Sequence, residues 1–249
     1  MASLLIWLPG LLLLLLGLWA VLLYRGVMAP IHAIHAGQYE RAARLVVQPS
    51  LLDRAPSIRH AKRYNLALAL CLDGQLERAA EVLAELPPGL DRNLEYARAS
   101  LTATLAGLRG DPRAALTEIQ VARALRDTPG DAWLEAVVLR ALGDEPGAER
   151  AAAQGRALGT PGVVLGVKTV LVHGAELERV GLAYLMGRFA ELGGADADAR
   201  EAYAAAAGSP IPSIYRTRAR EALPQVGVPS AAREEPEPST LAPHVLSRR

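Results

Sequence analysis

The sequence predicts an all-α protein in which a single N-terminal transmembrane helix is followed by an α-solenoid of about five helix–turn–helix units. Three observations predict this architecture. The stretch from Leu4 to Leu23 carries no charge, a spaced pair of glycine and alanine recurs along the remaining chain, and the residues are 51% apolar but only 4% aromatic. Alanine and leucine supply most of the apolar content, which suits closely packed helices. A β-sandwich would need more β-branched and aromatic residues.

The N-terminal apolar stretch is long enough to be a retained membrane anchor. About 20 helical residues cross a hydrocarbon core roughly 30 Å thick, and six consecutive leucines, Leu11 to Leu16, lie inside the stretch. A cleaved signal peptide would begin with basic residues, but none precedes the stretch, and Pro30 follows the nearest small-residue cleavage point at Ala29. A buried core helix would show one polar face. We therefore assign residues 1–29 to a transmembrane anchor and its junction.

The distribution of basic residues indicates the orientation of this anchor. Arg25 is the first charge after the apolar stretch, further arginines follow it, and no basic side chain precedes it. Basic residues favour the cytoplasmic side of a span. We therefore expect a single-pass protein of the inner membrane whose C-terminal domain lies in the cytoplasm.

A short pattern, glycine followed five residues later by alanine, recurs through the rest of the chain. The glycines are 37, 36, 33 and 51 residues apart, and the pairs are Gly37 with Ala42, Gly74 with Ala79, Gly110 with Ala115, Gly143 with Ala148, and Gly194 with Ala199. Each glycine lies between two apolar helical patterns, so it is expected to end one helix, and the polar residue beside it to begin the next. The alanine marks a place where two helices cross closely.

This spacing resembles that of the tetratricopeptide repeat, a helix–turn–helix unit of about 34 residues. The second unit matches the family pattern best, because Leu66, Ala67 and Leu70 stand at the core positions of its first helix and Pro87 ends the unit. The resemblance covers residues 30–223. It implies an α-solenoid with a concave binding surface.

The repeats depart from the family pattern at several points. Pro30 leaves room for only a short first helix in the first unit, and Pro146 and Gly147 are expected to disturb the start of the second helix in the fourth unit. Between the fourth and fifth units an irregular, valine-rich insert lies near residues 158–175. It is read either as an extra helix or half-repeat in the core, or as an exposed apolar loop that touches the bilayer or a partner.

The C-terminal part of the sequence divides into a cap and a tail. Ile214 to Leu223 form a polar amphipathic stretch, which suits the terminal helix that an open solenoid needs. Residues 224–249 are rich in proline, serine and glutamate. Such a composition cannot bury enough apolar surface to become ordered, so we expect a disordered tail.

The resemblance to tetratricopeptide proteins also implies a set of groove residues, because that family binds ligands mostly through the first helix of each unit. Transferred to this chain, the groove positions are Tyr64, Leu68, Cys71, Ser100, Thr104, Trp133, Val137, Arg140, Tyr184, Arg188 and Glu191. Aromatic and arginine side chains among them would suit a peptide or helix with apolar anchors and an acidic group. Alternatively, Trp133 and Tyr184 simply pack between helices.

The residues that could carry chemistry do not form a recognisable site. The net charge of +1 and the lack of a basic stripe argue against nucleic-acid binding. Cys71 is the only cysteine, which excludes an intramolecular disulfide and a thiolate zinc site, and His32 with His35 lacks a further ligand nearby. Phosphate-binding loops and nucleophile elbows do not occur. We therefore expect no enzyme activity, catalytic residue, cofactor, metal or small-molecule substrate.

These observations together suggest an adaptor. The leading hypothesis is a membrane-anchored helical-repeat scaffold that binds proteins or peptides at the bilayer surface, where the anchor raises the local concentration. The alternative is a dedicated assembly or regulatory subunit of one bacterial membrane or envelope complex. The bias toward alanine, arginine, glycine and leucine is typical of a GC-rich bacterial genome.

Overall fold

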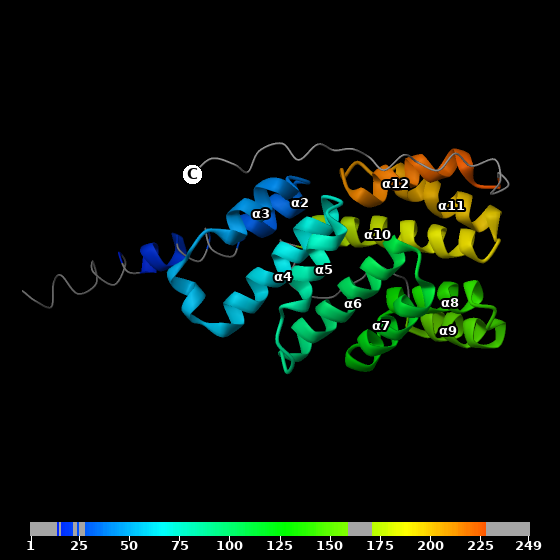
Figure 1. The fold of residues 1–249 in the computed structure, drawn as a ribbon, viewed down its shortest axis with the longest axis horizontal. Coiled ribbons are helices and arrows are strands. Elements are labelled where there is room, and N and C mark those ends of the chain that lie inside the picture. Colours follow the sequence, from blue (N-terminus) through cyan, green and yellow to red (C-terminus); the bar gives the residue numbers. More distant parts are fainter. Residues whose placement is uncertain (1–13, 15, 22–23, 25–27, 159–170, 228–249) are drawn as a thin grey trace, which may run out of the picture.

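The computed structural model describes residues 14, 16–21, 24, 28–158 and 171–227, and the described part is built from helices without a β-strand. Most of the chain forms five helical hairpins that follow one another (Figure 1). They are α2 (Ala29–His35) with α3 (Tyr39–Val47), α4 (Pro56–Leu72) with α5 (Leu76–Ala84), α6 (Arg92–Arg109) with α7 (Pro112–Leu125), α8 (Pro129–Ala141) with α9 (Glu145–Leu158), and α10 (Leu171–Leu192) with α11 (Asp196–Ala207). The all-α prediction is confirmed.

The five hairpins share one turn. Gly37, Gly74, Gly110, Gly143 and Gly194 all have φ between 71° and 88°, in the left-handed region where glycine carries no steric penalty. In each turn the glycine N–H donates to the carbonyl three residues earlier, and the next N–H donates to the carbonyl five residues before it. This Schellman arrangement satisfies carbonyls at the end of the first helix. The prediction that these glycines end helices is confirmed.

The alanine that follows each glycine turn is fully buried. Ala42, Ala79, Ala115, Ala148 and Ala199 each have a relative exposure of 0%. Each methyl group is therefore enclosed by its neighbours, in a hairpin whose two helices pack on each other. This burial agrees with the predicted close crossings.

Two prolines lie in the first turns of helices for which the sequence predicted a short length or a disturbed start. α2 has seven residues with Pro30 in its first turn, as expected for a short first helix. α9 begins at Glu145 with Pro146 as its second residue and continues for 14 residues. The expected disturbance by Pro146 was therefore wrong, because a proline in the first turn lacks only an N–H that has no partner within the helix.

A half-buried ion pair links the connection between α3 and α4 to α4 itself. Lys62 is 8% exposed, and its Nζ donates to Asp53 Oδ1 and to the Gln48 carbonyl, each at 2.8 Å. Asp53 belongs to the short 3₁₀ helix η2 (Leu51–Arg54), where its carboxylate also accepts from the Ser50 N–H. Burial by itself would raise the pKa of Asp53, but the hydrogen bonds and positive charge of Lys62 lower it overall. The pair therefore ties η2 and the end of α3 to α4.

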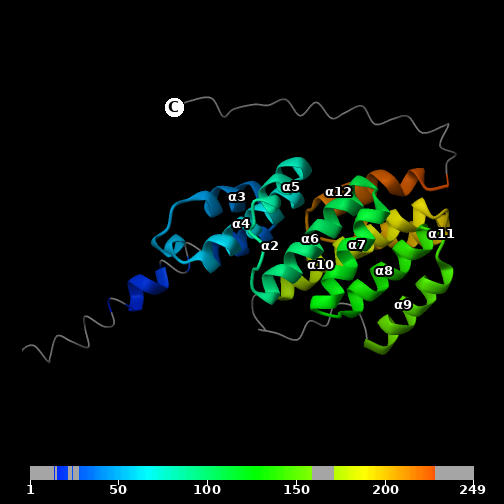
Figure 2. The same cartoon turned by 60° about the horizontal axis from the view of Figure 1, so that its bottom comes forward.

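The packing between hairpins departs from an open solenoid at α10. α3 packs on α4, and α7 packs on α8, as in a regular array. α10 instead packs on α8 and also contacts α6 and α2 (Figure 2). Helix α12 (Ile214–Ala222) contacts α11, α10 and α4. The fifth hairpin and α12 therefore fold back over the first helices of the earlier units.

This return brings the two ends of the array together. Tyr39, the first residue of α3, donates its hydroxyl hydrogen to the carbonyl of Pro212. Gly37 lies against the Pro212 ring, which an added Cβ would approach to 3.0 Å. The first hairpin therefore contacts the segment before α12, and the helical array is closed.

Several sequence predictions fall on residues outside the described part. Most of the predicted span from Leu4 to Leu23 lies there, and within the described residues no helix is both long and apolar enough to cross a membrane. Of the predicted insert, residues 159–170 also lie outside. Residues 171–175 are helical and open α10.

The C-terminal segment is ordered beyond the point that the composition indicated. The helix expected at Ile214 is present as α12, and a 3₁₀ turn, η3 (Leu223–Gln225), follows it. Val226 is 2% exposed, and its carbonyl accepts a 2.8 Å hydrogen bond from Arg200. The start of the expected disordered tail is therefore packed, because the apolar Val226 is buried beside α11. Residues 228–249 lie outside the described part.

Candidate functional site

A cleft of about 440 Å³ lies where α10 crosses the first helices of the earlier hairpins. Its lining comes mainly from α4, α6, α8 and α10. The principal lining residues are Ile34, His35, Tyr64, Leu68, Tyr96, Ala97, Ser100, Thr104, Arg126, Asp131, Leu134, Arg179, Leu182 and Leu185. Leucine side chains and tyrosine rings supply much of the apolar surface, and Tyr96, Arg126 and Asp131 form a polar group near the start of α8.

Helical spacing places the side chains of α4 and α6 in this cleft. Tyr64 and Leu68 are four residues apart, as are Tyr96, Ser100 and Thr104, so each set shares one helix face. Thr104 donates its hydroxyl hydrogen to the Ser100 carbonyl at 2.9 Å and is therefore satisfied within its own helix. The buried Ser100 hydroxyl has no hydrogen-bond partner within the described residues.

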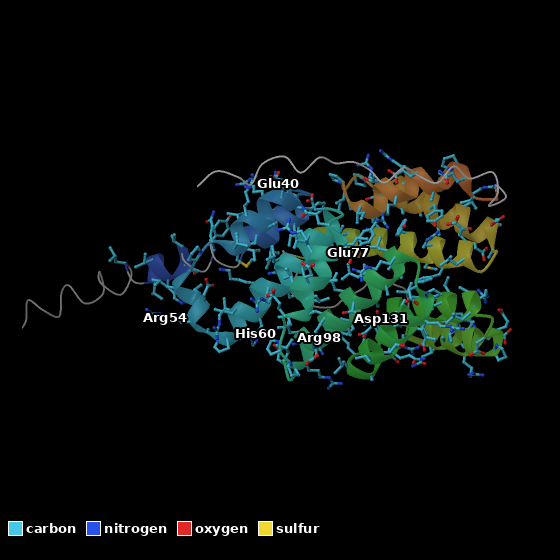
Figure 3. The ribbon with its side chains drawn as sticks, viewed as in Figure 1. Glu40, Arg54, His60, Glu77, Arg98 and Asp131 are labelled. Carbon is cyan, nitrogen blue, oxygen red and sulfur yellow. The ribbon has the colours of Figure 1, made fainter. Side chains whose placement is uncertain are left out.

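The polar end of the cleft is a hydrogen-bonded cluster at the N-terminus of α8. Asp131 Oδ2 accepts from the Tyr96 hydroxyl at 2.9 Å and from Thr128 Oγ1 at 2.7 Å. Thr128 also caps the helix by accepting from the Asp131 N–H. Figure 3 labels Asp131 at this end of α8. The cluster ties α6 to α8 across the cleft.

The electrostatics of this cluster follow from its burial. Desolvation raises the pKa of Asp131 above its ordinary value, although the Thr128 and Tyr96 hydrogen bonds act in the opposite direction. Burial and the charge of Asp131 raise the pKa of Tyr96 to about 12. The exposed Arg126 guanidinium lies 5.6 Å from the centre of the Tyr96 ring. The cleft therefore presents an apolar floor beside an acid and an exposed base.

Four of the predicted groove residues line this cleft, and three others line a second cavity. Tyr64, Leu68, Ser100 and Thr104 line the cleft. Trp133, Val137 and Arg140 line a second cavity of about 490 Å³, which lies among α8, α9, α10 and α11. The structure thus divides the predicted groove into two separate hollows, because α10 lies across the surface that an open solenoid would leave free.

The remaining predicted groove residues line neither cavity. Tyr184 is 4% exposed, with its ring 5.7 Å from that of Tyr203 and 6.1 Å from that of Tyr215. Glu191 accepts from the Tyr203 hydroxyl at 2.8 Å and from Arg188 at 3.2 Å. These three residues therefore line neither cavity, and Tyr184 follows the alternative that it packs between helices. Tyr184 contacts α11 and α12, and Glu191 contacts α11, whereas the Arg188 guanidinium reaches the turn at Gly110 between α6 and α7.

Cys71 is also a core residue. Its relative exposure is 0%, and it lies next to the Tyr215 hydroxyl. Burial raises the pKa of the thiol to about 12, so the reactive thiolate is scarce near neutral pH. In the described ranges no group of three or more His, Cys, Asp or Glu side chains is arranged to hold a metal ion.

The sequence reasoning missed Tyr96, Arg126, Asp131 and Leu182. Tyr96 lies one helical turn before Ser100, so helical spacing alone could have added it to the predicted set. Asp131 and Arg126 flank a helix start, where acidic residues and caps are common for structural reasons. Leu182 reaches the cleft only because α10 folds back, and no local pattern signals that contact.

Known protein families, curated proteins and solved structures contain no match to this chain. Its function is therefore inferred from its own residues and geometry.

Proposed function

We propose that this chain is a membrane-anchored adaptor whose helical-repeat domain binds a peptide segment of another protein in the cleft between α4, α6, α8 and α10. The single observation behind the proposal is the cleft itself, which places Tyr64, Leu68 and Leu182 beside the polar cluster of Tyr96 and Asp131. An apolar hollow with a few convergent polar groups is the usual form of a binding site.

The repeat domain in this proposal is of the tetratricopeptide type. Five hairpins with the same glycine turn and a fully buried alanine at the same offset support it. The regular spacing of the first four turns also supports it. The closure by α10 and α12 is a variation in which the last unit narrows the concave surface to a cleft.

The chemistry of the cleft suits a peptide with one large apolar side chain and one acidic group. Leu68, Leu134 and Leu182 would surround the apolar side chain. The exposed guanidinium of Arg126 would attract the acidic group.

The membrane anchor in this proposal is the apolar N-terminal stretch. Its described residues include Leu14, Leu18 and Trp19, which are 67%, 54% and 55% exposed. The helical residues 16–21 lie beyond the first hairpins, away from the core of the array (Figure 1). Large apolar side chains exposed on one segment need a covering surface, and a bilayer provides one.

The cleft is tested by site-specific photocrosslinking of the full chain in membranes. A benzophenone amino acid at Leu68 or Leu182 is expected to yield a discrete crosslinked protein, whereas the same amino acid at the exposed Ala114 is not. Ala97→Trp fills the cleft and is expected to abolish the product, while Asn93→Trp, one turn earlier and exposed on the same helix, is not. A product that survives Ala97→Trp would contradict the proposal.

The anchor is tested by carbonate extraction and by a topology reporter. The full chain is expected to stay with the membrane fraction, and the double variant Leu12→Arg, Leu15→Arg to be released, since each central arginine costs about 2.5–3.5 kcal/mol on insertion. A reporter fused after Arg249 is expected to be active only in the cytoplasm. Activity on the other side would overturn the orientation but leave the cleft untouched.

A further inference from the structure

The junction between the fourth and fifth hairpins leaves one helix surface without its usual neighbour. At two other junctions the second helix of one hairpin packs extensively on the first helix of the next, as α3 does on α4 and α7 on α8, and the contact of α5 with α6 is smaller. Within the described residues α9 has no comparable packing with α10, which rests on α8 instead. The hollow of about 490 Å³ lies in the place that this irregular packing opens, with α9 and α11 at its sides and α8 and α10 as its floor. Both α9 and α11 lie at the same end of the molecule in Figures 1 and 2.

Small side chains dominate the lining of this hollow, which is called the α9–α11 groove below. Alanines contribute from all four helices, and Gly193 adds a position without a side chain. Only a few larger apolar groups, chiefly Trp133, Val137 and Met186, project among them. The chain itself packs helix against helix over alanine at Ala42 and its four counterparts. The groove therefore has the surface that this chain uses elsewhere to receive a helix.

The two rims of the groove carry opposite charges. Arg140 on α8 and Arg156 on α9 stand on one side, and Asp198 and Glu201 on α11 stand on the other. Arg140 pairs with Glu145 at 3.1 Å, and Arg156 lies 5.9 Å from the Trp133 ring. Asp198 and Glu201 are exposed, and neither forms an ion pair with another residue that the structure describes. An occupant with one acidic and one basic edge would match both rims.

We propose that this groove binds an amphipathic helix of a partner protein, with a narrow apolar stripe on the floor, an acidic edge at Arg140 and Arg156, and a basic edge at Asp198 and Glu201. The apolar stripe would lie over the alanines and contact Trp133. The two charged rims fix the direction of the helix, because reversal would place like charges together. The site is separate from the cleft of the proposed function and does not depend on it.

Synthetic helical peptides test the charge pattern on the full chain in detergent or nanodiscs. Three fluorescein-labelled peptides share one Leu/Ala stripe and differ in their edges: glutamate on one and lysine on the other, lysine on both, or glutamate on both. Fluorescence anisotropy is expected to give a Kd at least about tenfold lower for the mixed-edge peptide, since each like-charged rim opposes binding. Equal affinities for the three peptides, or no binding of the mixed-edge peptide at millimolar concentration, would overturn the proposal.

Protein variants locate the binding. Ala202→Trp fills the groove and is expected to raise the Kd of the mixed-edge peptide at least about tenfold. Ala204→Trp lies on the same helix but is exposed outside the groove, so it is expected to leave this Kd unchanged. The double variant Asp198→Lys, Glu201→Lys makes both rims basic, so the preference is expected to shift to the glutamate-edged peptide. This variant keeps the test decisive even if Ala202→Trp does not fold. Unchanged preference would contradict the proposal, as would concentration-dependent self-association that Ala202→Trp abolishes, because the occupant would then be a second copy.

Discussion

At the residue scale, the smallest side chains decide how closely the helices approach. Ala79, Ala115 and Ala199 have no exposed surface, and each stands five residues after a glycine in a left-handed turn. Glycine is required at the turn because of its φ, and alanine at the crossing because of its size. The two requirements recur together, which is why a short pattern in the sequence was informative about packing.

The buried alanines predict that the same substitution changes stability very differently at two neighbouring positions on α7. Leucine at Ala115 has no space, so we expect Ala115→Leu to lower the free energy of unfolding by about 1–3 kcal/mol. Ala114 is exposed on the same helix, and Ala114→Leu is expected to change it by no more than about 0.5 kcal/mol. Urea unfolding followed by circular dichroism measures both. Equal effects would show that Ala115 does not lie at a close crossing.

Asp131 predicts a specific pH dependence of stability. Burial raises its pKa in the folded chain above the ordinary value of 3.8, so the folded state keeps a proton that the unfolded state has lost. Stability from this group therefore falls as the pH rises from below 3.8 to the folded pKa. The difference in free energy of unfolding between the wild type and Asp131→Asn should decline over this interval and then level off. A difference that rises with pH would mean that the hydrogen bonds and the start of α8 stabilise the carboxylate more than burial opposes it.

At the element scale, α10 is the helix that changes the architecture. It spans 22 residues and contacts α2, α6, α8, α11 and α12. Glycines allow several of these contacts. A Cβ added to Gly107 of α6 would lie 2.6 Å from Leu185, one added to Gly181 would lie 3.1 Å from Tyr215, and one added to Gly187 would lie 2.7 Å from Tyr203. The close approaches spread along the helix and fix its position in the array.

Even a methyl group added at Gly187 is therefore expected to destabilise the protein. Alanine gains about 1 kcal/mol of helix propensity, but its Cβ would press on the fully buried Tyr203 ring, and overpacking costs about 1–3 kcal/mol. We expect Gly187→Ala to be destabilising in thermal unfolding, and Tyr203→Leu in the same chain to recover part of the loss. Gly208→Ala, at an exposed helix end with an ordinary φ of −76°, is the control and is expected to be neutral or slightly stabilising. A stabilised Gly187→Ala would show that the Tyr203 ring can move.

At the scale of the whole molecule, closure links units that lie far apart in the sequence. Tyr215 of α12 reaches Cys71 of α4 and the Tyr184 ring of α10. Arg218 of the same helix donates a 2.7 Å hydrogen bond to the Leu108 carbonyl at the end of α6. In an open repeat array each unit contacts only its neighbours. Here α12 contacts three earlier hairpins, so a destabilising substitution at one end of the array is expected to destabilise helices at the other end.

Tyr215→Ala tests this linkage. Loss of a buried aromatic side chain costs about 3–5 kcal/mol, and we expect amide hydrogen exchange to become faster in α4 and α10 as well as in α12. Glu221→Ala, exposed on the same helix, should leave exchange in α4 unchanged. Faster exchange restricted to α11 and α12 would show that the array behaves as an open solenoid, with no linkage through α12.

Local patterns predicted much of the fold and a part of the candidate cleft. The glycine turns, the buried alanines, the short α2 and the helix at Ile214 all depend on residues near one another in the sequence, so the sequence alone indicated them. Tyr64, Leu68, Ser100 and Thr104 were predicted because helical spacing places them on one face of α4 or α6. Tyr184, Arg188 and Glu191 follow the same spacing on α10, yet these three line neither cavity.

The sequence by itself determined the helices, their turns and their close crossings, because these follow from backbone conformation and side-chain size within a few residues. Only the tertiary structure decided where α10 and α12 lie, and hence that the predicted concave surface becomes a cleft on one side and an open groove between α9 and α11 on the other. That choice depends on contacts such as Gly107 with Leu185 and Tyr39 with Pro212, which join residues 78 and 173 positions apart. Such contacts follow from the packing of the whole chain, and no local pattern records them.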